Sequence, residues 1–544
     1  FLTHTNNQTT KKNFAKKIQA TIANFKYIDV LAVGVIVLIG CIVRITEFGS
    51  LPAGLNQDEA FAGYEAYSLL NYGTDSWGYT NPCYFVSWGS GMNVLESYLA
   101  MPFIALFGLS VETFRMPQLI CACLSLPVFY LLLKEMFNKK IAIIGLFVLS
   151  VSPWHIMLSR WGLESNLAPA FLLFGLYFFV KGLKNNRYWI MSALMYGMAL
   201  YSYSITWAVV PVTVVLLGLY VLFSKHKISW RSTALSVFVL FVMALPLLLF
   251  VLVNKDIIPE IRTEYLSVPK LLVMRDYDIA LSNLKNSENW KNFFDLYMGQ
   301  NDGLIWNSTE DFKMFYKIST PFIALGFISL AVGACEKFRK RKFSFEFVVI
   351  IGTISSLLTC VMLTHVNVNR INSIHIYTAI LLAYGLYTFW ELGKAASKVR
   401  LVAKTVFILS LFVMTFSFYS FTKYYFNEYN NEISYTFNQG LEESVEYVNE
   451  KGYETVCVDS DAYFPQILFF DKTPTPKYLE TVEFSYYPAA FVGVRSFEKY
   501  TFGINYSELG KYDAYIIRSG STAFLEDAGF SVVNFGEFSV CFLE

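Results

Sequence analysis

Two adjacent carboxylates near the start of the chain are the residues best placed to do chemistry. Asp58 and Glu59 lie in a polar segment, residues 51–60, that follows the first apolar run. Asn56 is a typical helix N-cap, and Glu59 stands where a capping-box acid bonds back to it. Neighbouring residues of a helix point about 100° apart, so the two acids cannot share one substrate atom as a glycosidase pair does. We therefore predict Asp58 as a general base, or else as a first-turn acid that stabilises the helix dipole. Glu59 is predicted as a second catalytic residue or as the capping acid.

Arginines in short connections between later apolar runs could bind an anion. Arg160 and Arg370 lie at such positions, and Arg115 precedes another run. Charge is costly at the level of a membrane, so it marks binding sites there. The structural alternatives are an ion pair of Arg160 with Glu164, a pair of Arg115 with Glu112, and contact of Arg370 with lipid head groups.

Other reactive residues give weaker signals. His155 lies near Arg160 and belongs either to the same site or to the packing of a helix end. No HExxH, Walker loop, GxGxxG or nucleophile elbow occurs, and the eight cysteines form no CxxC pair, so no metal ligands are predicted. Cys457 and Cys541 could form a disulfide.

The composition shows which environment must position these residues. Hydrophobic residues make up 55% of the 544, charged residues only 16%, and the mean hydropathy is +0.43. Soluble domains carry about 25% charged residues, so most of this chain cannot face water. A net charge of +1 argues against a nucleic acid partner. The composition predicts an α-helical polytopic membrane protein.

Apolar runs and basic clusters predict the topology. Runs long enough to cross a membrane begin near Tyr27, Met116, Ile141, Leu167, Tyr188, Ile205, Thr233, Ile318, Phe347, Ile374 and Leu401. Lysines and arginines gather in every second connection, at residues 11–17, 134–140, 181–187, 225–231, 337–342 and 394–400. The positive-inside rule makes these connections cytoplasmic and predicts about eleven spans, with the N-terminus inside and the C-terminus outside.

Two long outer loops follow from this parity. In the first, residues 48–113, the apolar segment 91–110 must be interfacial or re-entrant, because a crossing there would invert every later basic loop. The second, residues 254–317, is polar and should hold one or two short helices. We expect a transmembrane catalytic domain over residues 1–421.

The composition becomes that of a soluble protein after Phe421. Residues 422–544 predict a small extracytoplasmic α/β domain, with a helix at 441–450 and strands at 454–458 and 513–518. A short helix at 522–528 and a closing hairpin at 530–542 complete the prediction. Nothing in the sequence assigns this domain a role.

Several short motifs, in this order, give the chain a family resemblance. They are Asp58-Glu59 after the first run, Arg115-Met116-Pro117 before the second, Ser159-Arg160 after the third, Pro321 and Gly326 after the second long loop, and residues 369–372, Asn-Arg-Ile-Asn, before the tenth. With this topology the first 400 residues resemble the GT-C glycosyltransferases. The nearest branch, similar to glycosyltransferase family 39, contains the protein O-mannosyltransferases and the lipid A aminoarabinose transferase. Relatives often carry His-Pro-Pro-Leu where residues 89–93 here read Gly-Ser-Gly-Met-Asn.

The resemblance implies transfer of a sugar from a polyprenyl-phosphate carrier to an acceptor at the outer face. Asp58 would take the proton of the acceptor hydroxyl, and a single displacement would invert the anomeric centre. The leaving phosphate needs cations rather than a proton donor, which Arg160, Arg370 and Arg115 would supply. No cofactor other than the lipid-linked donor is expected, and no divalent metal is required.

The resemblance also assigns a role to the second outer loop, which contributes to the cavity in this family. Asn301, Asp302 and Trp306 are the residues there that we expect at the substrate. His155, near Arg160, is a further candidate for binding the substrate. The acceptor is expected to be a protein, a lipid or a glycan. The protein is expected in a bacterial plasma membrane, surrounded by membrane lipids.

Two other functions remain open at the level of sequence. A polysaccharide polymerase or ligase would also present outer arginines but would not require the early Asp-Glu. A transporter or flippase of lipid-linked sugar would show duplicated halves and broken helices, and neither is evident here.

Overall fold

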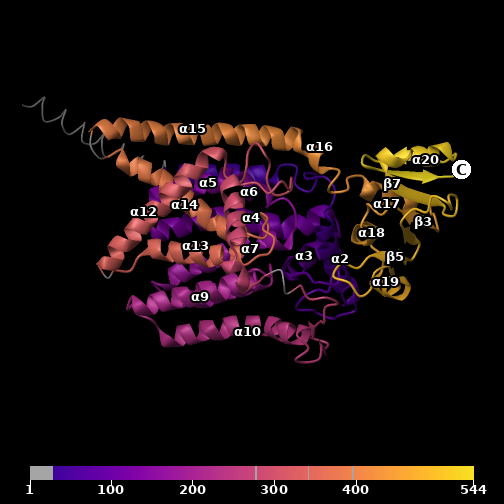
Figure 1. The fold of residues 1–544 in the computed structure, drawn as a ribbon, viewed down its shortest axis with the longest axis horizontal. Helices are drawn as coiled ribbons and strands as arrows, with labels where there is room; N and C mark the ends of the chain where they lie inside the picture. The colour runs from indigo at the N-terminus through magenta and orange to yellow at the C-terminus, as the bar shows by residue number, and fades with distance from the viewer. Residues whose placement is uncertain (1–28, 276–278, 341, 395–396, 544) are drawn as a thin grey trace, which may run out of the picture.

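The computed structural model describes residues 29–275, 279–340, 342–394 and 397–543. These residues form a helical bundle with a small sheet domain at one end (Figure 1). Residues 29–45 are helical. The helices that follow are α2 (Gln57–Tyr72), α3 (Leu95–Phe107), α4 (Val111–Met136), α5 (Lys139–Val151), α6 (Pro153–Met157), α7 (Glu164–Gly182), α8 (Tyr188–Leu200), α9 (Thr206–Phe223), α10 (Trp230–Asn254), α11 (Ser287–Gly299), α12 (Thr320–Arg339), α13 (Phe345–Val361), α14 (Asn372–Leu392), α15 (Ser397–Asn427) and α16 (Tyr429–Ile433). The predicted start of the first span, Tyr27, and the lysines at residues 11–17 lie outside the described residues.

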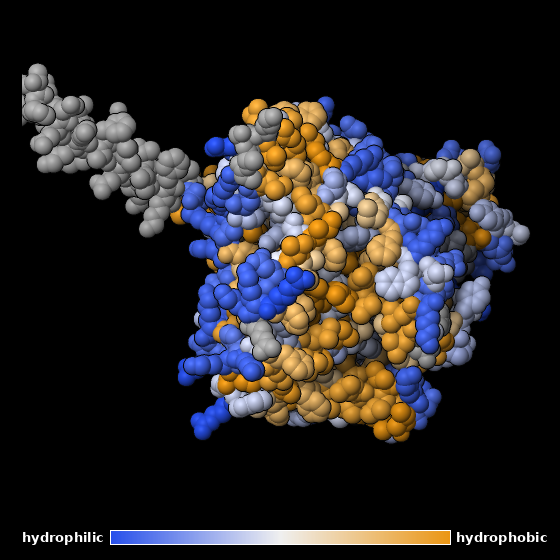
Figure 2. Space-filling model, turned by 60° about the vertical axis from the view of Figure 1, so that its left-hand side comes forward, coloured by the Kyte–Doolittle hydropathy of each residue, from blue (hydrophilic) through white to orange (hydrophobic). Residues whose placement is uncertain are grey.

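Helices occupy all eleven predicted apolar runs. Among the described residues, six helices are long and apolar enough to cross a membrane. They are Val111–Met136, Glu164–Gly182, Thr206–Phe223, Trp230–Asn254, Lys317–Arg339 and Val399–Asn427. Figure 2 shows hydrophobic residues gathered on the flank of the bundle, with hydrophilic residues at its ends. The chain is therefore a polytopic α-helical membrane protein.

Two of the basic connections can be followed to the end of the bundle opposite to the sheet domain. Figure 1 shows this for the turn from α9 to α10, at residues 225–231, and for the end of α12 before α13, at residues 337–340. This arrangement agrees with a shared side for those connections. That this side is the cytoplasm remains a prediction of the positive-inside rule.

The two long loops contain the short elements that the sequence predicted. Within the first, α3 lies beside α2 at the end of the bundle nearest the sheet domain (Figure 1). The second contains α11 and a 3-10 helix, η2 (Leu281–Lys285). It also contains a small antiparallel pair, β1 (Ile261–Arg262) and β2 (Ser267–Val268), which the sequence analysis missed.

The C-terminal domain is built on a seven-stranded mixed sheet. Its strand order is β4-β5-β6-β3-β7-β9-β8, and β3 pairs in parallel with both β6 and β7. The strands are β3 (Val456–Val458), β4 (Glu483–Phe484), β5 (Val494–Phe497), β6 (Tyr500–Phe502), β7 (Ala514–Arg518), β8 (Ser531–Asn534) and β9 (Phe538–Phe542). The helices are α17 (Leu441–Glu450), α18 (Phe464–Asp471), α19 (Thr475–Thr481) and α20 (Ala523–Asp527). Both predicted helices, both strands and the closing hairpin are present, whereas α18, α19, β4, β5 and β6 were not predicted.

The suggested disulfide between Cys457 and Cys541 is not formed. Both cysteines are buried and free. Tyr515 of β7 pairs with Cys457 on one side and with Cys541 on the other, so a whole strand separates them. Two strand spacings amount to roughly 9–10 Å, which exceeds the reach of a disulfide.

Helix α2 is packed between the bundle and the C-terminal domain. Phe61 and Tyr64 belong to one buried apolar cluster with Ile467 and Phe469 of α18. Tyr64 also donates its hydroxyl hydrogen to the carbonyl of Thr473, at 2.8 Å. At Gly63 a Cβ atom would come within 2.5 Å of the Phe469 ring, so the close approach of α2 and α18 requires glycine. The C-terminal domain thus rests directly on the helix that carries Asp58.

Candidate functional site

The first turn of α2 is fixed by a capping box. The Asn56 side chain accepts a hydrogen bond from the backbone N–H of Asp58, at 2.9 Å. The Asn56 N–H in turn donates to Glu59 Oε2, at 3.1 Å. These two bonds fix the backbone around Asp58 without engaging its side chain.

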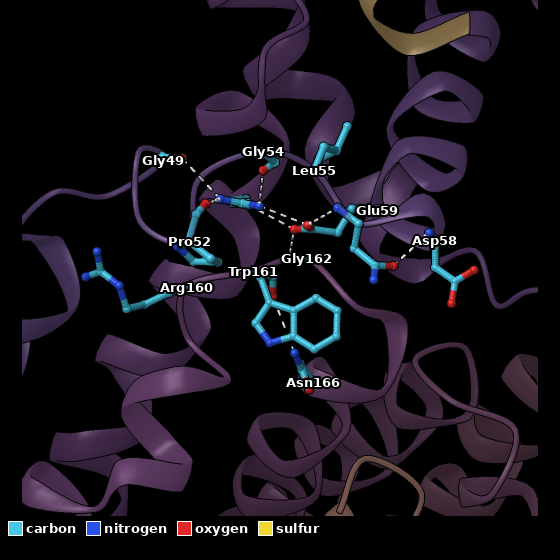
Figure 3. Close-up of polar contacts among 12 residues, drawn as sticks. Gly49, Pro52, Gly54, Leu55, Asp58, Glu59, Arg160, Trp161, Gly162 and Asn166 are labelled. Carbon is cyan, nitrogen blue, oxygen red and sulfur yellow. Dashed lines mark hydrogen bonds and ion pairs between the residues drawn. The ribbon is translucent and has the colours of Figure 1, made fainter. Parts of the chain in front are cut away.

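Glu59 is the buried partner of Arg115. Arg115 Nε and Nη2 donate to the two Glu59 oxygens at 2.8 and 2.9 Å, and neither side chain is exposed. The remaining Arg115 donors reach the backbone carbonyls of Gly49, Pro52 and Gly54. Gly162 N–H also donates to Glu59, at 2.5 Å. Figure 3 shows the Asp58 side chain pointing away from this network.

Asp58 lies on the wall of a cavity of about 470 Å³. Residues from both long loops, from the bundle and from the C-terminal domain form this wall. They are Asn56, Gln57 and Asp58; Trp88, Ser90, Gly91 and Met92; Trp161, Leu163, Glu164 and Ser165; Tyr203, Arg275, Leu304 and Trp306; Asn367, Asn369 and Arg370; and Thr436, Tyr463, Gln466 and Phe491. We refer to this space as the central cavity.

The surroundings of Asp58 favour a basic carboxylate. Trp88 Nε1 donates to Asp58 Oδ1 at 3.0 Å. Burial raises the pKa of Asp58 above its ordinary value of 3.8, whereas the hydrogen bond from Trp88 and the charge of Arg275 oppose that rise. A carboxylate with a raised pKa accepts a proton more readily, as a general base must.

Two arginines line the same cavity. The backbone N–H of Arg370 donates to the Asn367 side chain at 2.8 Å, which holds the turn between the two residues. Arg275 comes from the second long loop, and its guanidinium lies 5.1 Å from the centre of the Phe491 ring. A cavity lined by Asp58 and two arginines is suited to a reaction between one molecule that carries a hydroxyl and another that carries a phosphate.

A second acid faces the cavity. Glu164, the first residue of α7, accepts hydrogen bonds from the backbone N–H and the side chain of Asn93, at 2.5 and 2.9 Å. It does not pair with Arg160, so the ion pair given as the structural alternative for Arg160 is not formed.

Comparisons with known proteins agree with this architecture. The crystal structure of ArnT from Cupriavidus metallidurans in the apo state superposes with a TM-score of 0.57 at 12% identity, covering 95% of this chain and 98% of that one. The chain has the GT-C fold. The same protein bound to undecaprenyl phosphate also gives 0.57 at 12% identity, covering 94% of this chain and 97% of that one.

Two further comparisons cover less of the chain. The Archaeoglobus fulgidus oligosaccharyltransferase in complex with Zn and sulfate gives a TM-score of 0.51 at 15% identity, over 81% of this chain and 61% of that one. Residues 94–252 match the family described as dolichyl-phosphate-mannose-protein mannosyltransferase. No curated protein sequence matches the chain.

Within this GT-C fold, Arg115 and Arg160 do not have the position predicted for phosphate ligands. Arg160 is completely buried, and its guanidinium donates to four backbone carbonyls, those of Val43, Arg44, Glu47 and Leu51, at 2.8–3.1 Å. Figure 3 shows its side chain lying apart from Asp58. Both arginines instead hold the chain between the first helix and α2, where carbonyl groups lack helical partners.

Glu59 and His155 likewise lie away from the central cavity. Since every oxygen of Glu59 is engaged by Arg115, Asn56 or Gly162, its position does not fit a second catalytic residue, and the capping alternative is the one observed. His155 is buried, with Nδ1 2.7 Å from an Arg44 nitrogen. Its position is that of a structural histidine.

The second long loop contributes one predicted residue to the cavity. Trp306 lines it. Asp302 instead accepts hydrogen bonds from Leu304, Asn307 and Val368, at 2.7–3.0 Å. The Asn301 side chain donates to Glu310 and accepts from Gly303 and Ser308. These two residues shape the loop that carries Trp306 rather than lining the cavity.

Some cavity residues were missed from the sequence. Arg275 stands in a long mixed loop, where a lone basic residue has no distinguishing pattern. Trp88 has the same sequence signal as a tryptophan of the membrane interface, and its bond to Asp58 depends on tertiary packing. No local signal could place Tyr463 and Phe491 of the C-terminal domain at this site.

Proposed function

We propose that this protein is a glycosyltransferase that moves a sugar from a polyprenyl-phosphate-linked donor to an acceptor hydroxyl in the central cavity. The observation that carries the proposal is that Asp58, Arg275 and Arg370 line one space. The family matched by residues 94–252 is described by a dolichyl-phosphate-linked sugar, and ArnT has been crystallised with undecaprenyl phosphate. Both descriptions support a lipid phosphate as the donor carrier.

The proposed reaction is a single displacement. Asp58 takes the proton of the acceptor hydroxyl as the acceptor oxygen bonds to the anomeric carbon of the donor sugar. The bond between that carbon and the phosphate oxygen breaks, and its electron pair leaves with the phosphate. Arg275 and Arg370 then stabilise the additional negative charge on the phosphate. One displacement inverts the anomeric configuration, and no metal ion takes part.

The test is transfer of radiolabelled sugar from polyprenyl-phosphate donors in membranes that contain the full chain. We expect Asp58→Asn to lower the transfer rate by roughly 10²–10⁴-fold, the usual contribution of general-base catalysis. Asp256→Asn is the matched control, because Asp256 is an exposed acid that pairs with Lys270 outside the cavity. A fully active Asp58→Asn variant, or a product with retained configuration, would contradict the mechanism.

Two other outcomes would replace the function itself. Movement of lipid-linked sugar across vesicles without any transfer would identify a transporter. Polymerisation of the donor's own glycan would identify a polymerase or ligase. Transfer that persists in EDTA is expected, and loss of transfer with recovery on adding a divalent metal would contradict the metal-independent mechanism.

A further inference from the structure

A second cavity opens on the other side of Asp58. Its volume is about 760 Å³, and it lies between the start of α2 and the C-terminal domain. Both cavities share the wall residues Gln57, Asp58, Trp88, Tyr463 and Phe491. We refer to this second space as the domain cleft. The Asp58 carboxylate therefore stands where the central cavity and the domain cleft meet.

The domain cleft lies at the edge of the sheet where ligands bind in open α/β folds. Ser460 follows the end of β3 by two residues, and Gly503 directly follows β6, and both line the cleft. β3, β6 and β7 are parallel, with β3 between the other two. The chain thus runs from β3 to β6 on one side of β3 and later continues to β7 on its other side. A crevice at the carboxyl ends of strands where the order reverses is the usual ligand site of such sheets.

A loop of the C-terminal domain joins the cleft to the catalytic carboxylate. Val492 N–H donates to the Trp88 carbonyl at 2.8 Å, and Phe491 forms a β-bridge with Gly89. Gly89 has a φ of +113°, and a Cβ there would meet the Ala489 carbonyl, so only glycine admits this approach. Trp88, held in this way, is the residue that donates to Asp58.

The lining of the domain cleft matches the chemistry of sugars. Three aromatic side chains remain substantially exposed there: Tyr463 at 46%, Tyr486 at 72% and Phe491 at 59%. Exposed aromatic groups that cluster in a concavity mark a binding surface. The C–H faces of pyranose rings carry partial positive charge and stack on the negative faces of aromatic rings. Arg495 adds one cation at the wall.

We propose that the domain cleft binds the acceptor and that the acceptor is a glycan. Its end would pass between Trp88 and Phe491 so that one hydroxyl reaches Asp58, while the donor occupies the central cavity. Arg495 would pair with an anionic substituent of the glycan. The inference rests on the proposed function for the act of transfer, but glycan binding in the cleft can be measured without it.

Photo-crosslinking of the full chain in its own cells tests the proposal directly. A benzophenone amino acid replaces Tyr486 inside the cleft, or Leu543 as the matched control. Leu543 is 50% exposed and follows β9, which ends beside the start of β7, so it lies at the opposite edge of the sheet. We expect the probe at position 486 to capture a molecule that periodate cleaves and that stays undigested on the probe peptide after protease treatment. We expect no captured molecule at position 543.

Other adduct patterns at positions 486 and 543 overturn the inference. A captured molecule that protease itself digests would identify a polypeptide acceptor. Absence of an adduct at 486, or equal adducts at 486 and 543, would show that the cleft binds no glycan. Adding Arg495→Ala to the 486 probe should lower the adduct yield several-fold if the glycan is anionic. A glycan adduct in a protein that transfers no sugar would keep the binding site and reject the transferase function, which separates the two failures.

Discussion

The Glu59 carboxylate and the Arg115 guanidinium meet through two hydrogen bonds of 2.8 and 2.9 Å, inside the protein and out of contact with solvent. This pair joins α2 to α4 and fixes the start of the helix on which the next acid stands. Its neighbour Asp58 faces the central cavity. The adjacent acids therefore have separate surroundings, since Glu59 is buried against Arg115 and Asp58 lines the central cavity.

Removing Glu59 should damage the fold rather than the chemistry. In Glu59→Ala the Arg115 charge stays buried without its carboxylate, which costs about 3–5 kcal/mol when one partner of a buried pair is lost. We expect a much lower unfolding temperature in detergent and a low yield of folded protein. Glu112→Ala serves as the control, because Glu112 is an exposed acid on α4, the helix that carries Arg115. A Glu59→Ala variant as stable as the wild type would show that the pair contributes little.

The local part of this arrangement could be predicted from the sequence, and the long-range part could not. Asn56 and Glu59 form a capping box because their spacing alone determines it. Helix α17 and the hairpin of β8 and β9 likewise follow from local periodicity and turn residues. Arg160, in contrast, satisfies carbonyl groups more than one hundred residues away. An arginine at the outer end of a span has the same sequence signal whether it faces a cavity or a backbone.

The pH dependence of transfer should report the bond between Trp88 and Asp58. A base works only when deprotonated, so kcat/KM should fall as the pH drops through the pKa of Asp58, which burial holds above 3.8. The Trp88 hydrogen bond stabilises the charged carboxylate. Trp88→Phe should therefore raise this pKa further and move the acid limb of the pH profile to higher pH.

Trp77→Phe is the matched control for that measurement. The Trp77 indole donates to the Ser87 carbonyl at 2.9 Å and not to an acid, so its loss should leave the acid limb in place. An unchanged limb in Trp88→Phe would mean that the group titrating in the profile is not Asp58.

Binding of the donor phosphate should depend on Arg275 and Arg370. A hydrogen bond to a charged group contributes about 1.5–3 kcal/mol, so Arg370→Ala should lower kcat/KM for the donor by roughly 10- to 150-fold. Arg370→Lys should recover part of the loss, because it restores the charge but not the planar fork. Arg262→Ala is the control, since Arg262 stacks on Tyr79 outside the central cavity. Equal donor kinetics in Arg370→Ala and Arg262→Ala would exclude Arg370 as a phosphate ligand.

The orientation of the chain can be tested on both ends of the bundle at once. Lys227, in the turn between α9 and α10, and Leu543, after β9, are exposed at opposite ends. Each is changed to cysteine in a chain in which the exposed Cys335 is replaced by serine. If the basic turns are cytoplasmic, an impermeant maleimide should label Leu543→Cys in intact cells and Lys227→Cys only after permeabilisation. The reverse pattern would place Asp58 and the C-terminal domain in the cytoplasm, where the donor sugar would have to be presented on the inner leaflet.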